Sequence, residues 1–180
     1  QEKIITASYG GFKRYSYADW WIKGALPFVG EIAEKKLRLR SNNATIVGST
    51  SYIAVIEFDL SVLPSNYELE SATLDLTAVL HSFSSSSPKI IANVGDLNWQ
   101  TLGANTPVYT VEMELGRASV IGENISVSNT GTCTIALNKS KISGNKLVIE
   151  LRREYISTEV SGYTEFDTQI NLPKLTIQYH

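Results

Sequence analysis

The pattern of apolar and polar positions is clearest in residues 53–76. In the first half of this stretch every second residue is apolar, which is the period of a half-buried strand; these residues are Ala54, Ile56, Phe58 and Leu60. A second alternating series runs from Ala72 to Leu80. Leu63, Pro64 and the polar residues after them predict a turn, because proline fixes φ and Ser and Asn side chains bond nearby backbone. The stretch therefore predicts two strands of a sheet and the corner between them.

Short alternating segments continue along most of the chain. Further strands are predicted at residues 3–7, 36–40, 90–94, 108–115, 131–137, 147–151 and 175–179. The serine-rich residues 81–88 predict an exposed loop. About nine or ten strands, with turn signals at roughly ten-residue spacing, predict an all-β fold, a jelly-roll-like antiparallel β-sandwich that forms one domain over residues 1–180. No run of 18 apolar residues occurs, so the sequence predicts no membrane span.

Residues suited to binding sugars are concentrated near the start of the chain. The C–H face of a sugar ring packs on an aromatic ring, whereas Arg and Lys bind the carboxylates of uronic acids. The candidate carbohydrate-binding residues are Lys13, Arg14, Tyr15, Tyr17, Trp20, Trp21, Lys23, Lys36, Arg38 and Arg40. Alternation in residues 36–40 places the last three on one strand face. In the alternative interpretation, the tryptophans cover one end of the sandwich and the basic residues form a solvated strand face.

The charge distribution points to an anionic ligand that binds locally. The net charge is −2, yet residues 1–40 hold eight of the sixteen Lys and Arg, whereas residues 41–116 hold only Lys89. A nucleic-acid-binding protein is more often basic over its whole surface. A basic patch on an acidic body suits a localised anionic ligand better, so nucleic acid is not an expected partner.

Residues suited to catalysis are scarce. The only histidines are His81 and His180, and no Gly-X-Ser-X-Gly motif occurs, which argues against a Ser-His-Asp hydrolase. Cys133 alternates with apolar residues and is predicted to lie in the core. Glu57 and Asp59 share a strand face, but the simplest interpretation is that Asp59 caps the strand end while Glu57 is paired or solvated. No cofactor is expected, although a structural calcium stays open because calcium needs only carboxylates and carbonyls.

Several segments, in this order, match the pattern of one family. They are residues 58–61 (FDLS), 63–64 (LP), 71–76 (SATLDL), 97–99 (LNW), 106–107 (TP) and 172–179 (LPKLTIQY). The chain resembles the disaggregatase-related (DNRLRE) β-sandwich domains, which include modules attached to polysaccharide lyases and alginate-binding carbohydrate-binding modules. The resemblance covers residues 37–180 and implies a β-sandwich that binds a polysaccharide. Residues 1–34 diverge, because they are aromatic and basic where family members open with a short Asp-containing strand and an Asn-Tyr-Gly turn.

These observations predict a non-catalytic module that binds an anionic, uronic-acid-containing polysaccharide outside the cell or at the cell surface. A linked catalytic domain is a further expected partner. The main alternative is a structural or adhesive surface domain that binds proteins. A third hypothesis is a lyase that removes the proton beside a uronate carboxylate, in which Tyr15 or Tyr17 would act on the proton and Lys13 would neutralise the carboxylate.

Overall fold

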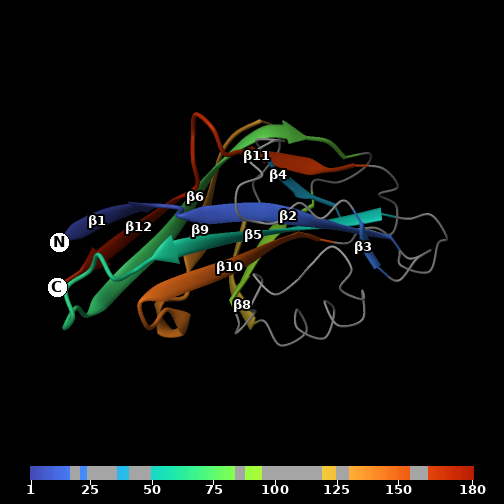
Figure 1. The fold of residues 1–180 in the computed structure, drawn as a ribbon. Helices are drawn as coiled ribbons and strands as arrows, with labels where there is room; N and C mark the ends of the chain where they lie inside the picture. Colours follow the sequence, from blue (N-terminus) through green and yellow to red (C-terminus); the bar gives the residue numbers. More distant parts are fainter. Residues whose placement is uncertain are drawn as a thin grey trace.

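The chain forms two stacked antiparallel sheets (Figure 1). The computed structural model describes residues 1–16, 21–23, 36–40, 50–83, 88–94, 119–124, 130–154 and 162–180. The strands are β1 (Glu2–Thr6), β2 (Tyr9–Ser16), β3 (Trp21–Lys23), β4 (Lys36–Leu39), β5 (Thr50–Asp59), β6 (Leu69–His81), β7 (Ile90–Val94), β8 (Ser119–Asn124), β9 (Gly131–Leu137), β10 (Lys146–Arg153), β11 (Thr164–Asp167) and β12 (Lys174–Tyr179). A 3₁₀ turn, η2 (Lys139–Lys141), precedes β10. Within the described ranges, no helix has the length and apolarity needed to cross a membrane.

Each sheet has six strands. Sheet A has the order β1-β12-β6-β11-β4, and β9 pairs with β6 as well. Sheet B has the order β3-β2-β5-β10-β7-β8. The expected all-β antiparallel sandwich is therefore confirmed, while the jelly-roll strand order stays a prediction.

One hydrophobic cluster joins the two sheets, and strand alternation explains its composition. On β6 the inward residues are Ala72, Leu74, Leu76 and Ala78, and on β5 they are Ala54, Ile56 and Phe58. All seven are at most 3% exposed. Cys133 is buried among them, as predicted, and burial together with the Asp75 carboxylate raises the pKa of its thiol to about 12.

The corner after β5 connects the two sheets rather than two strands of one sheet. The sequence-based assignment of β5 and β6 to a single sheet is wrong, because β5 pairs with β2 and β10 whereas β6 pairs with β12, β9 and β11. Alternation shows which face of a strand is buried, but not which strand is its hydrogen-bonded neighbour. The Leu60 N–H donates to Asn145 O at 2.8 Å and holds the corner in place. The side chains of Leu60 and Leu63 are buried beneath the corner. Asp59 accepts from the Ser61 N–H at 2.9 Å, which confirms its capping role.

A register shift changes the inward face near the end of β6. Glu165 pairs with Leu80, but Phe166 pairs with Ala78, so Val79 is the extra residue of a β-bulge. A bulge inverts the alternation beyond it. Leu80, predicted to face inward, is therefore only half-buried, whereas His81 is buried. The prediction that residues 81–88 are all exposed is wrong at both ends, because His81 and Pro88 are buried.

Two strands, β8 and β11, show no clear alternation of apolar and polar residues, and the sequence did not predict them. All four residues of β11 are buried, and β8 contains a glycine. A strand covered on both faces has no polar side to mark it. The predicted strand at residues 108–115 lies outside the described residues.

β8 and β9 close one side of the sandwich. The Asn138 N–H bonds Ile121 O at 2.7 Å, and Lys141 Nζ bonds Val120 O at 2.7 Å. A Cβ added at Gly122 would meet Ala136 O at 2.5 Å and Ile135 Cγ2 at 2.7 Å. The two sheets approach this closely because residue 122 has no side chain.

Gly122→Ala should therefore destabilise the protein. The added methyl meets a backbone oxygen, which cannot rotate away, so β8 must move from β9. We expect a loss of about 1–3 kcal/mol in the free energy of unfolding, the usual cost of overpacking, measured by urea titration. Thr132→Ala on the exposed face of β9 is the control and should change stability by about 0.5 kcal/mol or less. Equal stability of Gly122→Ala and wild type would contradict the close approach.

Candidate functional site

The sequence-predicted binding residues lie on three strands of the two sheets. Lys13, Arg14 and Tyr15 are on β2, Trp21 and Lys23 are on β3, and Lys36 and Arg38 are on β4, with Arg40 directly after it. Tyr17 and Trp20 lie outside the described residues. β4 ends sheet A, β3 ends sheet B, and β4 packs against β2. The structure therefore brings these strands to one lateral edge of the sandwich, in different layers, toward the end opposite the chain termini (Figure 1).

The register divides the predicted positions on β2 between the two faces of sheet B. Position 13 pairs with Ile53 and position 15 with Ser51, whereas position 14 pairs with Tyr52 and with Lys23 of β3. Neighbouring positions of a strand alternate between faces. Positions 13 and 15 therefore share the face away from the hydrophobic core.

On β4, Arg38 already has partners within the protein. Leu37 and Leu39 are fully buried, so Arg38 is on the outer face of sheet A, as predicted. Its Nε donates to Glu165 Oε1 at 2.8 Å, and Nη2 lies 2.6 Å from the same oxygen. Its guanidinium carbon lies 5.5 Å from the centre of the Tyr163 ring. A charge-assisted bond and a cation–π contact hold Arg38 in place, so much of its hydrogen-bonding capacity is used internally.

Beneath this pair, on the inner face, lies a buried polar network. His81 Nδ1 is 2.8 Å from Thr164 Oγ1, and Arg153 Nη1 donates to the same hydroxyl at 3.3 Å. Arg153 Nη2 donates to Ser82 O at 2.5 Å, and the Ser82 hydroxyl donates to Tyr163 O at 3.2 Å. Arg153 is on sheet B and the other four residues are on or beside sheet A, so the network joins the layers. It fixes the start of β11, which carries Glu165 on its outer face.

The sequence interpretation missed this network, although one signal was present. Leu147, Ile149 and Leu151 alternate inward on β10, and Arg153 continues the same series. It is only 2% exposed. The next residue back along β10, Arg152, points to the outer face and is half-buried.

Buried polar side chains also lie on the outer face of sheet B. Gly11 and Glu150 both pair with Val55, and Glu150 pairs on its other side with Asn93, so these four residues form one row across the sheet. Glu150 is 3% and Asn93 is 6% exposed. Position 13 lies two residues after Gly11 on β2, and Arg152 lies two residues after Glu150 on β10. These two positions form the next row on the same face. These two adjacent rows, which we call the sheet B face, combine cationic positions with a buried carboxylate.

The carboxylate of Glu150 is only half satisfied. Oε1 accepts a hydrogen bond from Arg152 Nε, whereas Oε2 is buried and has no hydrogen-bond partner in the part of the chain that the structure describes. Burial raises the pKa of Glu150, against the lowering effect of Arg152. A buried acceptor without a donor is costly, so a donor from a water molecule or a ligand would be bound favourably there.

The other predicted acid pair has a structural role. Glu57 is 6% exposed and its Oε2 lies 3.5 Å from Lys146 Nζ, whereas Asp59 is exposed and caps the strand end. The prediction that Glu57 is paired or solvated is thus confirmed. Among the described residues, no three His, Cys, Asp or Glu side chains come together as a metal site. A structural calcium elsewhere stays open, as the sequence left it.

Comparison with known proteins leaves the chain without an assigned family. No protein-family model matches it, and no curated protein matches it at a significant level. The resemblance to DNRLRE domains therefore stays a prediction.

Arg153→Met should test the buried network. Methionine keeps the length of the side chain but leaves Ser82 O and the Thr164 hydroxyl without their donors, so we expect a loss of about 2–4 kcal/mol in unfolding free energy. Lys139→Met, at an exposed position of η2, is the control and should change stability by about 0.5 kcal/mol or less. Chemical denaturation measures both, and equal effects would show that the Arg153 network adds nothing.

Glu150→Gln should be at least as stable as wild type at neutral pH. A carboxyl whose pKa is raised in the folded state costs stability above its ordinary pKa of 4.5, because the folded protein then holds a buried charge that the unfolded chain solvates. Glutamine removes that charge, and we expect a gain of about 1 kcal/mol at pH 7. The gain should shrink as the pH falls toward 4.5, because folded wild-type Glu150, with its raised pKa, takes up a proton above that pH. Thermal unfolding across this range measures the difference, and a gain that grows on acidification would contradict the assigned direction.

Proposed function

We propose that this protein is a non-catalytic module that binds an anionic, uronic-acid-containing polysaccharide through the sheet B face. In this proposal the sandwich is jelly-roll-like, as in the DNRLRE domains that the chain resembles. The module works outside the cell or at its surface, alone or beside a linked catalytic domain.

The supporting observation is the arrangement of charges on a face outside the core. Position 13 and Arg152 lie in one row, two strands apart, with Glu150 and Asn93 in the row beside them. Strands are about 4.8 Å apart, so the two basic positions are separated by roughly 10 Å. Two carboxylates on different units of one polymer can therefore each meet a basic side chain.

Of the described side chains in these rows, Arg152 is the cation that a sugar can reach. It is half-buried, offers a planar fork for a carboxylate, and is held in place by its bond to the buried Glu150. Lys13 and Tyr15, whose positions share this face, would supply the point charge and the aromatic platform. Arg38 and Arg40 would extend the positive potential around the lateral edge from sheet A.

We propose no catalytic role because the residue types that usually perform catalysis are already bonded to polar partners or are poorly reactive. Both histidines of the chain already have polar partners: His81 is buried against Thr164, and His180 contacts Glu68 and Glu70. The single thiol has a pKa of about 12 and carries almost no thiolate at neutral pH.

A structural or adhesive domain is the second candidate, and two end strands favour it. Ile4 on β1 is 55% exposed and Val120 on β8 is 46% exposed. Strands at sheet ends that carry apolar residues can add a strand from a partner. In this case the partner would be a protein and binding would be insensitive to uronate polymers.

Affinity electrophoresis in gels containing alginate, pectate or a neutral glucan tests the proposal. We expect retardation by one of the uronate polymers, weakened by salt because exposed charges are screened. Lys13→Gln and Arg152→Gln should each weaken binding by about three- to tenfold, the effect of losing one charge-assisted contact.

Lys3→Gln and Lys174→Gln are matched controls, since they remove the same charge from exposed positions on β1 and β12 of sheet A. Thermal melting checks that each variant is folded. Equal retardation of all four variants would place binding elsewhere, and no retardation in any uronate gel would favour the adhesive domain.

A further inference from the structure

A pocket of about 360 Å³ lies at the other end of the molecule from β3 and β4, where the two chain termini meet. It is lined by Gln1, Pro64, Asn66, Tyr67, Glu68, Tyr179 and His180. Ligand sites commonly begin at about 300 Å³ and combine apolar walls with a few polar groups. The pocket is separate from the sheet B face.

The backbone around the pocket is held by hydrogen bonds between distant parts of the chain. Gln1 and Tyr179 exchange two bonds, from Gln1 N to Tyr179 O at 2.6 Å and from Tyr179 N to Gln1 O at 2.9 Å. Glu68 and His180 form a second reciprocal pair at 2.9 and 3.1 Å. The lining residues between 64 and 68 belong to the corner before β6, and the Glu68–His180 pair ties that corner to the end of β12 in sheet A.

Two aromatic rings form the apolar part of the lining. Tyr179 is 8% exposed and belongs to the hydrophobic core, and Tyr67 packs against it edge to face, with ring centroids 6.2 Å apart and an interplanar angle of 82°. Tyr67 is only half-buried, so part of it stays accessible. An aromatic ring can contact the C–H face of a sugar or a cation.

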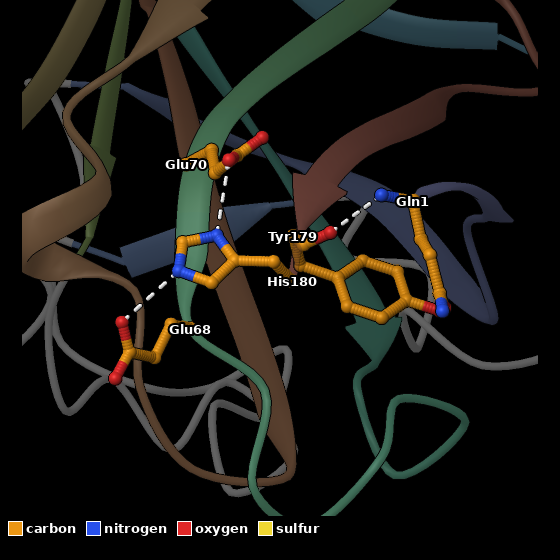
Figure 2. Close-up of polar contacts among 5 residues, drawn as sticks. All are labelled: Gln1, Glu68, Glu70, Tyr179 and His180. Carbon is orange, nitrogen blue, oxygen red and sulfur yellow. Dashed lines mark hydrogen bonds and ion pairs between the residues drawn. The ribbon is translucent and has the colours of Figure 1, made fainter.

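The polar part is acidic: Glu68 lines the pocket, Glu70 lies beside it, and both side chains are exposed. His180 lies between two carboxylates, with Nδ1 3.0 Å from Glu70 Oε1 and Nε2 3.2 Å from Glu68 Oε2 (Figure 2). Each ring nitrogen of His180 is therefore within hydrogen-bonding distance of one carboxylate. A carboxylate has two oxygens, so each keeps acceptor capacity that a donor on a ligand would bond.

We propose that this pocket binds a monosaccharide unit carrying a protonated amine, that is, an amino sugar. Tyr67 would contact the apolar face of the ring, Glu68 would accept from the ammonium group, and Asn66 would bond a hydroxyl. The acidic rim repels phosphate and uronate ligands, so the pocket selects the opposite charge from the sheet B face. The proposal does not depend on the function proposed above.

Titration of the 180-residue protein with methyl glucosaminide and methyl glucoside, followed by NMR, tests it directly. The two ligands differ only in the amine at the ring. We expect the amino sugar to bind about five- to tenfold more tightly, as a partly exposed charge pair with an aromatic contact allows. Chemical-shift changes should centre on Tyr67, Glu68 and His180.

Glu68→Gln should reduce the affinity for the glucosaminide to that for the glucoside. The Glu68 side chain is 80% exposed, so this variant is expected to fold normally. Glu2→Gln is the control, because Glu2 is an exposed acid on β1 that does not line the pocket. Equal binding of the two sugars, shifts centred on other residues, no saturable binding, or an equal effect of Glu2→Gln would each overturn the proposal.

Discussion

The pairing of β6 with three other strands is the constraint on which the rest of this structure depends. Its first part bonds β12, its middle bonds β9 on the opposite edge, and its last residues bond β11. The inward series from Ala72 to Ala78 supplies the centre of the core beneath these contacts. Because β12 also carries β1, and β11 carries β4, a shift of β6 by one residue would invert the buried face of all sheet A.

The bulge at Val79 changes which residues at the end of β6 face inward, and it thereby positions a polar network. Beyond it His81 faces inward, where its ring bonds Thr164, and Arg153 reaches the same hydroxyl from sheet B. On the opposite face of β11, Glu165 bonds Arg38. The inner network and the outer ion pair therefore lie on the two faces of one short strand. Movement of either layer would disturb both, so the lateral edge that carries the predicted basic residues is held by polar bonds as well as by the core.

Much of the fold could be predicted from the sequence, because alternation reports directly on burial. Phe58, Leu74 and Cys133 are all buried as their positions indicated. Alternation does not show which strands pair with one another. The two strands on either side of the corner after Asp59 were therefore assigned to one sheet, although they belong to two. It also fails where both faces are covered, as in β11, and where a bulge changes the phase, as at Leu80.

The candidate site was less predictable, since its key residues have no local pattern. Glu150 and Arg153 are ordinary members of an alternating strand. Only the neighbouring strands show that Glu150 lacks a hydrogen-bond donor for one oxygen and that Arg153 joins the two sheets. The pocket depends on Tyr67 and His180, which are far apart in the chain and meet because β12 pairs with β6.

The two proposed binding regions differ in how the fold sets their charge. On the sheet B face, basic positions come from β2 and β10, which are brought together by their common neighbour β5. At the termini, Glu70 is in β6 and Glu68 directly precedes that strand, and His180, directly after β12, meets them through its two backbone bonds with Glu68. The first arrangement requires the whole sheet, whereas the second requires only the register of one strand pair. A substitution that loosens the end of β12 should therefore affect the pocket while leaving the sheet B face intact, because β12 has no partner in sheet B.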